Sequence, residues 1–232
     1  DTFRYMPGIG VAQGEGNRDT PVLRGNSSTA DFFVDGIRDD VQYIRDVYNL
    51  ERVEALKGPN AMVFGRGGSG GVINRITRQA DGESHRSGSL QVGSGDRRRG
   101  TVDVGDGFGT GNAGFRVNAM YEDSGSFRDG YEQERYGFNP TFGIDLGERT
   151  RLRLSYERFH DERVADRGVP SLDGRPLDVD PSTFFGNPAQ SPVEATVDAF
   201  DAVIEHAFAD DLSLRNHLRW AAYDKSYQNV FP

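Results

Sequence analysis

The sequence of 232 residues contains no cysteine, three methionines and one tryptophan. The absence of cysteine excludes a disulfide framework, a thiolate metal site and a cysteine nucleophile. No apolar run approaches the roughly 20 residues that a membrane-spanning helix needs. Basic residues are also few, 27 against 36 acidic ones, and the net charge of -9 comes without any basic run. Nucleic acid is therefore not expected as a partner.

Glycine and aromatic residues are what the sequence does have. It contains 30 glycines, and 11% of its residues are aromatic. A disordered chain would lack these aromatics, and a helical bundle would not carry so much glycine. The first residue is Asp1 rather than Met, and the last residues follow directly on a strand pattern. We therefore expect a fragment of a longer protein.

Apolar and polar residues alternate from about residue 84 onward. In one segment Phe115, Val117 and Tyr121 share one face of a predicted strand, and Arg116 and Asn118 share the other. The same pattern recurs at 135–145, 151–157 and 212–220, and more weakly at 86–93, 99–108 and 197–208. A period of two is typical of β-strands with two different faces. Residues 84–232 are thus predicted to form about seven strands.

These strands fit two architectures. In a soluble β-sandwich the apolar face would pack against a second sheet. In an outer-membrane barrel it would face lipid, and the charged face would line a wet lumen. Strands of about ten residues and aromatics near strand ends favour the barrel. So does the alternation of short connections (146–149, 209–211) with long ones (123–133, 161–196). The sandwich remains the alternative.

Residues 1–80 form a different, glycine-rich zone with short strand-like segments and a helix expected at 44–50. Six motifs follow one another in this zone: Pro7-Gly8-Ile9, Leu23-Arg24-Gly25, the segments 33–39, 51–54 and 57–66, and Gly70-Gly71-Val72-Ile73-Asn74. In this order and spacing the zone closely resembles the plug domain of TonB-dependent outer-membrane receptors, in the siderophore-receptor branch. Segment 35–43 most resembles the catecholate type.

The resemblance implies a fold and a function. It implies a membrane β-barrel of about 22 antiparallel strands with an α/β plug inside. Residues 1–80 would be the C-terminal part of the plug, and residues 84–232 the first strands of the barrel. The whole protein would import a ferric siderophore across the bacterial outer membrane as a monomer. TonB would act through an N-terminal box that precedes Asp1. Cargo such as cobalamin or a glycan is the alternative.

The resemblance also suggests site residues. Three plug apices, at 13–18, 26–30 and 38–43, would face the ligand, and the ligand-binding candidates are Arg18, Asn26, Ser27, Arg38, Gln42 and Tyr43. Arginine would supply charge to an anionic cargo, and tyrosine a stacking face. Arg24 and Lys57 match family positions that pair with barrel glutamates, which would lie after residue 232. The alternative is that all of these are ordinary exposed side chains.

Neither a cofactor nor catalysis is expected. The siderophore itself would hold the iron, and the four histidines, at 85, 160, 206 and 217, lack a ligand spacing. Ser69 formally satisfies G-x-S-x-G, which raises a serine hydrolase as a third hypothesis. However, a nucleophile elbow needs a following helix, and residues 72–77 read as a strand. Loop 161–196 could be either a lid or a passive extracellular loop.

Overall fold

The computed structural model describes residues 5–12, 14–27, 31–58, 64, 70–109 and 111–230. Its strands form four sheets of seven, four, three and two strands. A 3₁₀ turn, η3 (Pro188–Gln190), lies among the described residues. The described part of the chain holds no helix with the length and apolar character that crossing a membrane would require.

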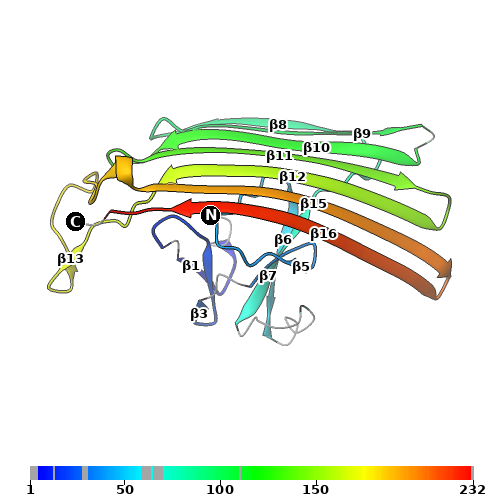
Figure 1. The fold of residues 1–232 in the computed structure, drawn as a ribbon, viewed down its shortest axis with the longest axis horizontal. Helices are drawn as coiled ribbons and strands as arrows, with labels where there is room; N and C mark the ends of the chain where they lie inside the picture. The colour runs from blue at the N-terminus through cyan, green and yellow to red at the C-terminus, as the bar shows by residue number, and fades with distance from the viewer. Residues whose placement is uncertain are drawn as a thin grey trace.

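The seven-stranded sheet, here called the large sheet, is antiparallel throughout, with the order β16-β15-β12-β11-β10-β9-β8. Its strands are β8 (His85–Val92), β9 (Arg98–Phe108), β10 (Ala113–Gly125), β11 (Glu132–Asp145), β12 (Thr150–Val164), β15 (Pro192–Ala209) and β16 (Leu212–Tyr227). The tight turns β9–β10, β11–β12 and β15–β16 meet at one end, on the right in Figure 1. The long connections lie at the other end.

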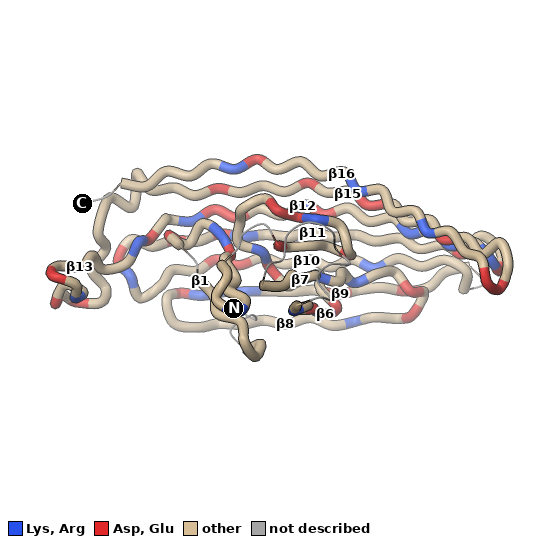
Figure 2. Tube along the Cα trace, turned by 90° about the horizontal axis from the view of Figure 1, so that it is seen from below, with Lys and Arg blue, Asp and Glu red and all other residues tan. Residues whose placement is uncertain are grey.

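The alternation in sequence gives the large sheet two different faces. Phe115 and Phe138 point away from the rest of the protein, with exposed fractions of 39% and 46%. Arg116 and Asn118, on the opposite face, are buried. The predicted facing of these strands is therefore confirmed. Charged residues of both signs are spread along the strands rather than gathered in one patch (Figure 2).

Residues 5–80, here called the inner unit, contain two small sheets. The first has the order β1-β2-β3, with β1 (Ile9–Ala12), β2 (Thr20–Leu23) and β3 (Asn26–Ser27). The second has the order β5-β4-β7-β6, with β4 (Phe32–Val34), β5 (Ile37–Arg38), β6 (Leu50–Lys57) and β7 (Gly71–Thr77), and its β4–β7 pair is parallel. Leu23, Phe32 and Ile73 form the apolar core that joins the two sheets.

The two small sheets approach each other closely at Gly70. A Cβ atom at this position would lie 2.2 Å from the backbone oxygen of Leu23. Only glycine leaves room for that contact. Most of the rest of the glycine run, including Ser69, lies outside the described residues.

The helix expected at 44–50 is wrong. The carboxylate of Asp46 accepts hydrogen bonds from the backbone N–H groups of Val47, at 2.7 Å, and Tyr48, at 2.9 Å. This Asx turn competes with a helix, and β6 then begins at Leu50. No α-helix occurs among the described residues of the inner unit, and its regular elements there are strands.

The inner unit lies against the charged face of the large sheet (Figures 1 and 2). At the left-hand end of Figure 1, the connection between β12 and β15 carries a hairpin of β13 (Ser171–Leu172) and β14 (Arg175–Pro176). Arg128, from the β10–β11 connection, holds this loop by donating to Asp166 at 3.1 Å and to the backbone oxygen of Thr183 at 3.1 Å. The loop is thus fastened to the neighbouring connection.

Candidate functional site

A cavity of about 830 Å³ lies between the inner unit and the large sheet. The inner unit lines it with loops 14–19 and 44–48 and with Arg78, and the large sheet lines it with β8 to β12 and the connections after β10 and β12. Six of its lining residues are arginines and five are Asp or Glu. Charges of opposite sign are therefore nearly balanced around a polar space.

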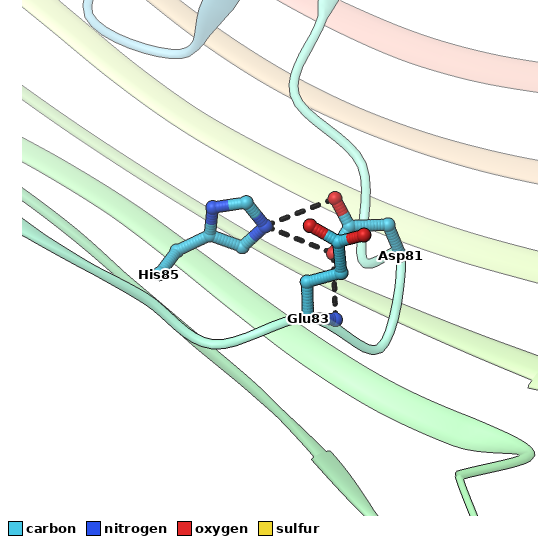
Figure 3. Close-up of side chains that lie close together, drawn as sticks. All are labelled: Asp81, Glu83 and His85. Carbon is cyan, nitrogen blue, oxygen red and sulfur yellow. Dashed lines mark hydrogen bonds and ion pairs between the residues drawn. The ribbon is translucent and has the colours of Figure 1, made fainter.

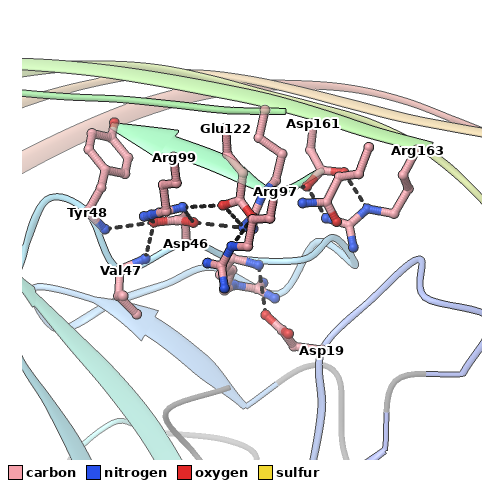
Figure 4. Close-up of polar contacts among 12 residues, drawn as sticks. Asp19, Asp46, Val47, Tyr48, Arg97, Arg99, Glu122, Asp161 and Arg163 are labelled. Atoms are coloured by element: carbon pink, nitrogen blue, oxygen red, sulfur yellow. Dashed lines mark hydrogen bonds and ion pairs between the residues drawn. The ribbon is translucent and has the colours of Figure 1, made fainter. Parts of the chain in front are cut away.

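Asp46 lies at the centre of the ionic contacts in this cavity (Figure 4). Its Oδ1 is 2.7 Å from Nη2 of Arg99, and its Oδ2 is 3.2 Å from Nη1 of Arg135. Both arginines also contact Glu122 at 2.6 Å, and Arg97 contacts Glu122 at 3.2 Å. Two arginines of the large sheet thus bind one carboxylate from the inner unit, Asp46, and one from the sheet itself, Glu122.

The arrangement changes the acidity of Asp46. Burial raises the pKa of this carboxyl, whereas the guanidinium groups of Arg99 and Arg135 lower it by more. The net pKa of Asp46 is below its usual value, and the group is a carboxylate at neutral pH.

A second buried cluster surrounds Asp39, whose side chain is fully enclosed. Its Oδ2 lies 3.1 Å from Nε of Arg45 and also accepts from Arg75, while Oδ1 accepts from the hydroxyl of Tyr223 at 2.9 Å. Tyr223 belongs to the large sheet, so the cluster crosses to it. Burial raises the pKa of Asp39, but the two guanidinium groups outweigh it and lower the pKa to about 2.

Glu157 of the large sheet makes a third connection between the two units. Its Oε1 accepts from the hydroxyl of Tyr48 at 3.2 Å and from the amide of Asn49 at 3.0 Å. The ring of Tyr48 lies over Gly137, where a Cβ would come within 2.6 Å of it. The absence of a side chain at Gly137 makes room for Tyr48.

The predicted ligand residues are not gathered in one place. Arg18 donates to Glu15 at 3.3 Å and to Asn17 at 2.9 Å, beside the cavity. Asn26 and Ser27 are exposed in β3. The guanidinium of Arg38 lies 4.9 Å from the ring centroid of Phe33. Of the 13–18 and 26–30 apices, residues 13 and 28–30 lie outside the described part of the chain.

Tyr43 and Gln42 lie at the contact with the large sheet. Tyr43 is buried between Phe159 and Tyr223, with ring centroids 6.2 and 6.1 Å away. Its position differs from the exposed stacking face that the sequence predicts. The backbone oxygen of Gln42 accepts from Nζ of Lys225 in β16 at 2.5 Å.

Arg24 and Lys57 make contacts inside the inner unit. Nζ of Lys57 donates to the backbone oxygen of Pro7, and the guanidinium of Arg24 lies beside Gly58. The glutamates predicted to pair with these two cations were expected after residue 232, so their role in the contact stays a prediction.

The ion pairs that join the two units were not predicted from the sequence. The family resemblance implies plug cations facing barrel glutamates. In the structure the charges are the other way round: Asp46, an acidic residue of the inner unit, is bound by Arg99 and Arg135 of the large sheet. The alternation of apolar and polar residues does place both arginines on the charged face of the large sheet, here called the covered face because the inner unit lies against it. That signal identifies them as inward-facing but gives no partner.

One group of side chains has the composition of a metal site. Asp81, Glu83 and His85 offer ligand atoms within 4.8 Å of one another (Figure 3). Nε2 of His85 lies 2.9 Å from both carboxylate oxygens of Asp81, and Asp81 also accepts from the backbone N–H of Glu83 at 3.0 Å. The group lies where the inner unit joins β8. These mutual contacts pair Nε2 of His85 and the carboxylate of Asp81 without a metal.

Comparison with known proteins agrees with this geometry. A family model described as TonB-dependent Receptor Plug Domain matches residues 1–72. The catecholate siderophore receptor Fiu of Escherichia coli K12 is 32% identical over 250 residues, which cover 98% of this chain and 32% of that protein. The chain therefore spans about a third of the length of this relative.

Solved structures give the same result. The siderophore receptor PiuA from Acinetobacter baumannii matches with a TM-score of 0.90 and 28% identity, over 98% of this chain and 34% of that one. The open form of the ferric-catecholate import receptor Fiu from E. coli K12 matches with a TM-score of 0.85 and 30% identity, over 95% of this chain and 35% of that one. These proteins are receptors rather than enzymes.

Proposed function

The chain belongs to the TonB-dependent receptor family, and from this premise we propose that it forms part of an outer-membrane receptor that imports a ferric siderophore. Residues 1–80 are the C-terminal part of the plug, and residues 84–232 are the first seven strands of the barrel. The relatives are siderophore receptors, which supports a location of this receptor in the outer membrane of a bacterium. It acts there as a monomer.

The observation that supports this proposal most strongly is the apolar face of the large sheet. Leu218 and Trp220 are 60% and 58% exposed, and large apolar side chains continue along the same face. Within the described residues, the inner unit covers only the opposite, charged face. Exposed apolar surface on this scale is typical of contact with lipid, and charges on the other face are typical of a wet lumen.

The cavity is suited to an anionic cargo. A ferric catecholate complex carries negative charge, and Arg97, Arg99, Arg135 and Arg163 line the cavity with guanidinium groups. Guanidinium binds oxyanions through paired hydrogen bonds. The iron stays in the siderophore, so the receptor needs no metal ligands or cofactor of its own. The name of the relative Fiu favours the catecholate type over other cargo.

Import needs energy, which this barrel does not generate. We propose that TonB supplies it through an N-terminal segment of the full-length receptor. The plug–barrel contacts described above include ion pairs and hydrogen bonds between charged or polar side chains. Such contacts can break and re-form, as removal of a plug requires.

The experiment is a binding titration of the full-length receptor in detergent with iron(III) tris-catecholate, followed by intrinsic fluorescence. We expect saturable binding, and no binding of iron-free catechol or of cobalamin. Tight binding of cobalamin together with no response to the ferric complex would contradict the proposed cargo. A full-length protein that stays monodisperse without detergent would instead favour the soluble sandwich.

A further inference from the structure

Asp46 is held in the cavity in the way an oxyanion ligand would be held. Nη1 of Arg99 donates to its Oδ2 at 2.9 Å and Nη2 donates to its Oδ1 at 2.7 Å, a bidentate contact. Arg135 adds a third contact at 3.2 Å. The side chain is only 5% exposed. A carboxylate of the inner unit thus fills the site that two arginines of the large sheet form.

The same two arginines have a second carboxylate of their own. Glu122 lies on β10, between the strands of Arg99 and Arg135, and contacts both at 2.6 Å. Glu122 belongs to the large sheet and stays with the arginines whatever the inner unit does. Of these two carboxylates, only Asp46 joins the two units. Loss of its contacts would therefore loosen loop 44–48 without leaving the arginines unpaired.

The near balance of charge around the cavity constrains how a cargo can bind. With almost as many carboxylates as arginines in the lining, an anionic cargo meets little net attraction until a carboxylate gives up its arginines. Asp46, Arg99, Glu122 and Arg135 all line the cavity, so a cargo that enters it reaches this contact directly.

We propose that Asp46 is an internal competitor of the cargo: an anionic group of the ferric siderophore takes Arg99 and Arg135 from Asp46, and loop 44–48 of the plug is thereby released from the barrel wall. This inference rests on the proposed function and adds the residue that couples occupancy of the cavity to the attachment of the plug. By linkage, Asp46 weakens the binding of cargo by the same factor by which cargo weakens the contact of Asp46.

The other contacts between the two units do not fit this role. Asp39, Glu157 and Tyr223 do not line the cavity, although Arg45 and Tyr48, which contact Asp39 and Glu157, do. The Arg45–Asp39 pair lies within the inner unit, and the bond of Tyr48 to Glu157 involves no arginine that an anionic cargo could take. These contacts hold the plug before and after binding, so the release that we propose is limited to the part of loop 44–48 around Asp46.

The test uses Asp46→Asn and Glu122→Gln in the full-length receptor. Asparagine keeps a side-chain oxygen that can accept from Val47 and Tyr48, so the turn is preserved while the charge is lost. Glutamine at position 122 removes the same charge from the same arginines but leaves the bridge from the plug intact. The two readouts are the affinity for iron(III) tris-catecholate and the amide hydrogen exchange of segment 44–50 with and without it.

We expect the ferric complex to accelerate exchange in segment 44–50 of the wild type and of Glu122→Gln. In Asp46→Asn we expect fast exchange already without the complex, no further acceleration, and an affinity about tenfold higher, within the usual range of couplings. Slower exchange of this segment on binding in the wild type would overturn the inference without any variant. So would an unchanged affinity in Asp46→Asn. A wild type that does not bind the ferric complex would overturn the proposed function as well.

Discussion

The two faces of the large sheet differ in almost every physical property. The covered face carries Arg99, Arg116 and Asn118, all buried beneath the inner unit. The other face carries Phe138, Leu218 and Trp220, all strongly exposed. In a water-soluble protein the buried face would be the apolar one. The covered face is thus rich in buried polar and charged groups, and the exposed apolar face needs a non-aqueous neighbour.

Two kinds of contact hold the inner unit against the sheet. One is a set of ion pairs and hydrogen bonds, and the other is an apolar cluster in which Tyr43 and Tyr48 of the inner unit pack against residues of the sheet, Phe159 among them. A buried ion pair is costly to break by removing one partner but gives little net stability. Contacts of this kind fix the position of the plug without making it permanent.

The largest effect is expected from Asp39→Ala, a substitution in the inner unit where it contacts the covered face of the large sheet. It leaves the guanidinium groups of Arg45 and Arg75 buried without their carboxylate and should cost about 3–5 kcal/mol in the free energy of plug unfolding. Denaturant titration of the full-length receptor measures this cost. The control is Asp40→Ala, the loss of a neighbouring exposed carboxylate. Equal costs for the two variants would show that the cluster does not hold the plug.

The next largest effect is expected from a pair of substitutions on opposite faces of β12. Leu154→Arg places a charge on the apolar face of β12 and should cost about 2–4 kcal/mol of barrel stability. Arg153→Leu, on the covered face, removes an ion pair with Glu205 at 2.8 Å and should cost much less. Folding titrations in lipid vesicles measure both. If the order were reversed, the assigned facing of β12 would be wrong.

Acid should weaken the Asp39 cluster of the inner unit over a defined pH range. The pKa of Asp39 is lowered from 3.8 to about 2, so its stabilisation is complete above pH 3.8 and is lost as the pH falls toward about 2. That loss should be on the order of 2 kcal/mol. The difference in unfolding free energy between wild type and Asp39→Asn, measured against pH, should shrink across this range. A difference that stays constant down to about pH 2 would contradict the lowered pKa.

The smallest effect is expected at the exposed end of the strands. Arg151 and Asp145 form an ion pair at 2.5 Å, with side chains 57% and 38% exposed. Exposed pairs of this kind contribute about 0–1 kcal/mol. Arg151→Ala should therefore lie near the lower limit of what a folding titration detects. A cost comparable with that of Leu154→Arg would mean that the turn end of the barrel is less hydrated than we describe.

The sequence predicts the faces of the strands because alternation is a local property. Each of Phe115, Arg116, Val117 and Asn118 follows from its neighbours in the chain. Local rules also explain the error at 44–50. A helix is expected there, but the side chain of Asp46 binds the backbone N–H groups of Val47 and Tyr48.

The partners across the cavity could not be predicted in this way. Asp46 and Arg99 are 53 residues apart, and their contact depends on how the inner unit sits against the sheet. The same holds for Tyr43, an aromatic residue in a loop, which the sequence places at an exposed apex and tertiary packing buries. The resemblance to a family predicted the fold, but it did not predict which side chains form the ionic contacts.

Contact of the apolar face with lipid is tested most directly by the environment of Trp220, the one tryptophan of this chain. The receptor is folded into bilayers of lipids brominated on the acyl chains, and the fluorescence of Trp220→Phe is subtracted from that of the wild type. We predict that bromine quenches the difference signal strongly and that aqueous iodide barely affects it. Quenching by iodide with no effect of bromine would show that the apolar face meets water or protein, and would contradict the membrane barrel.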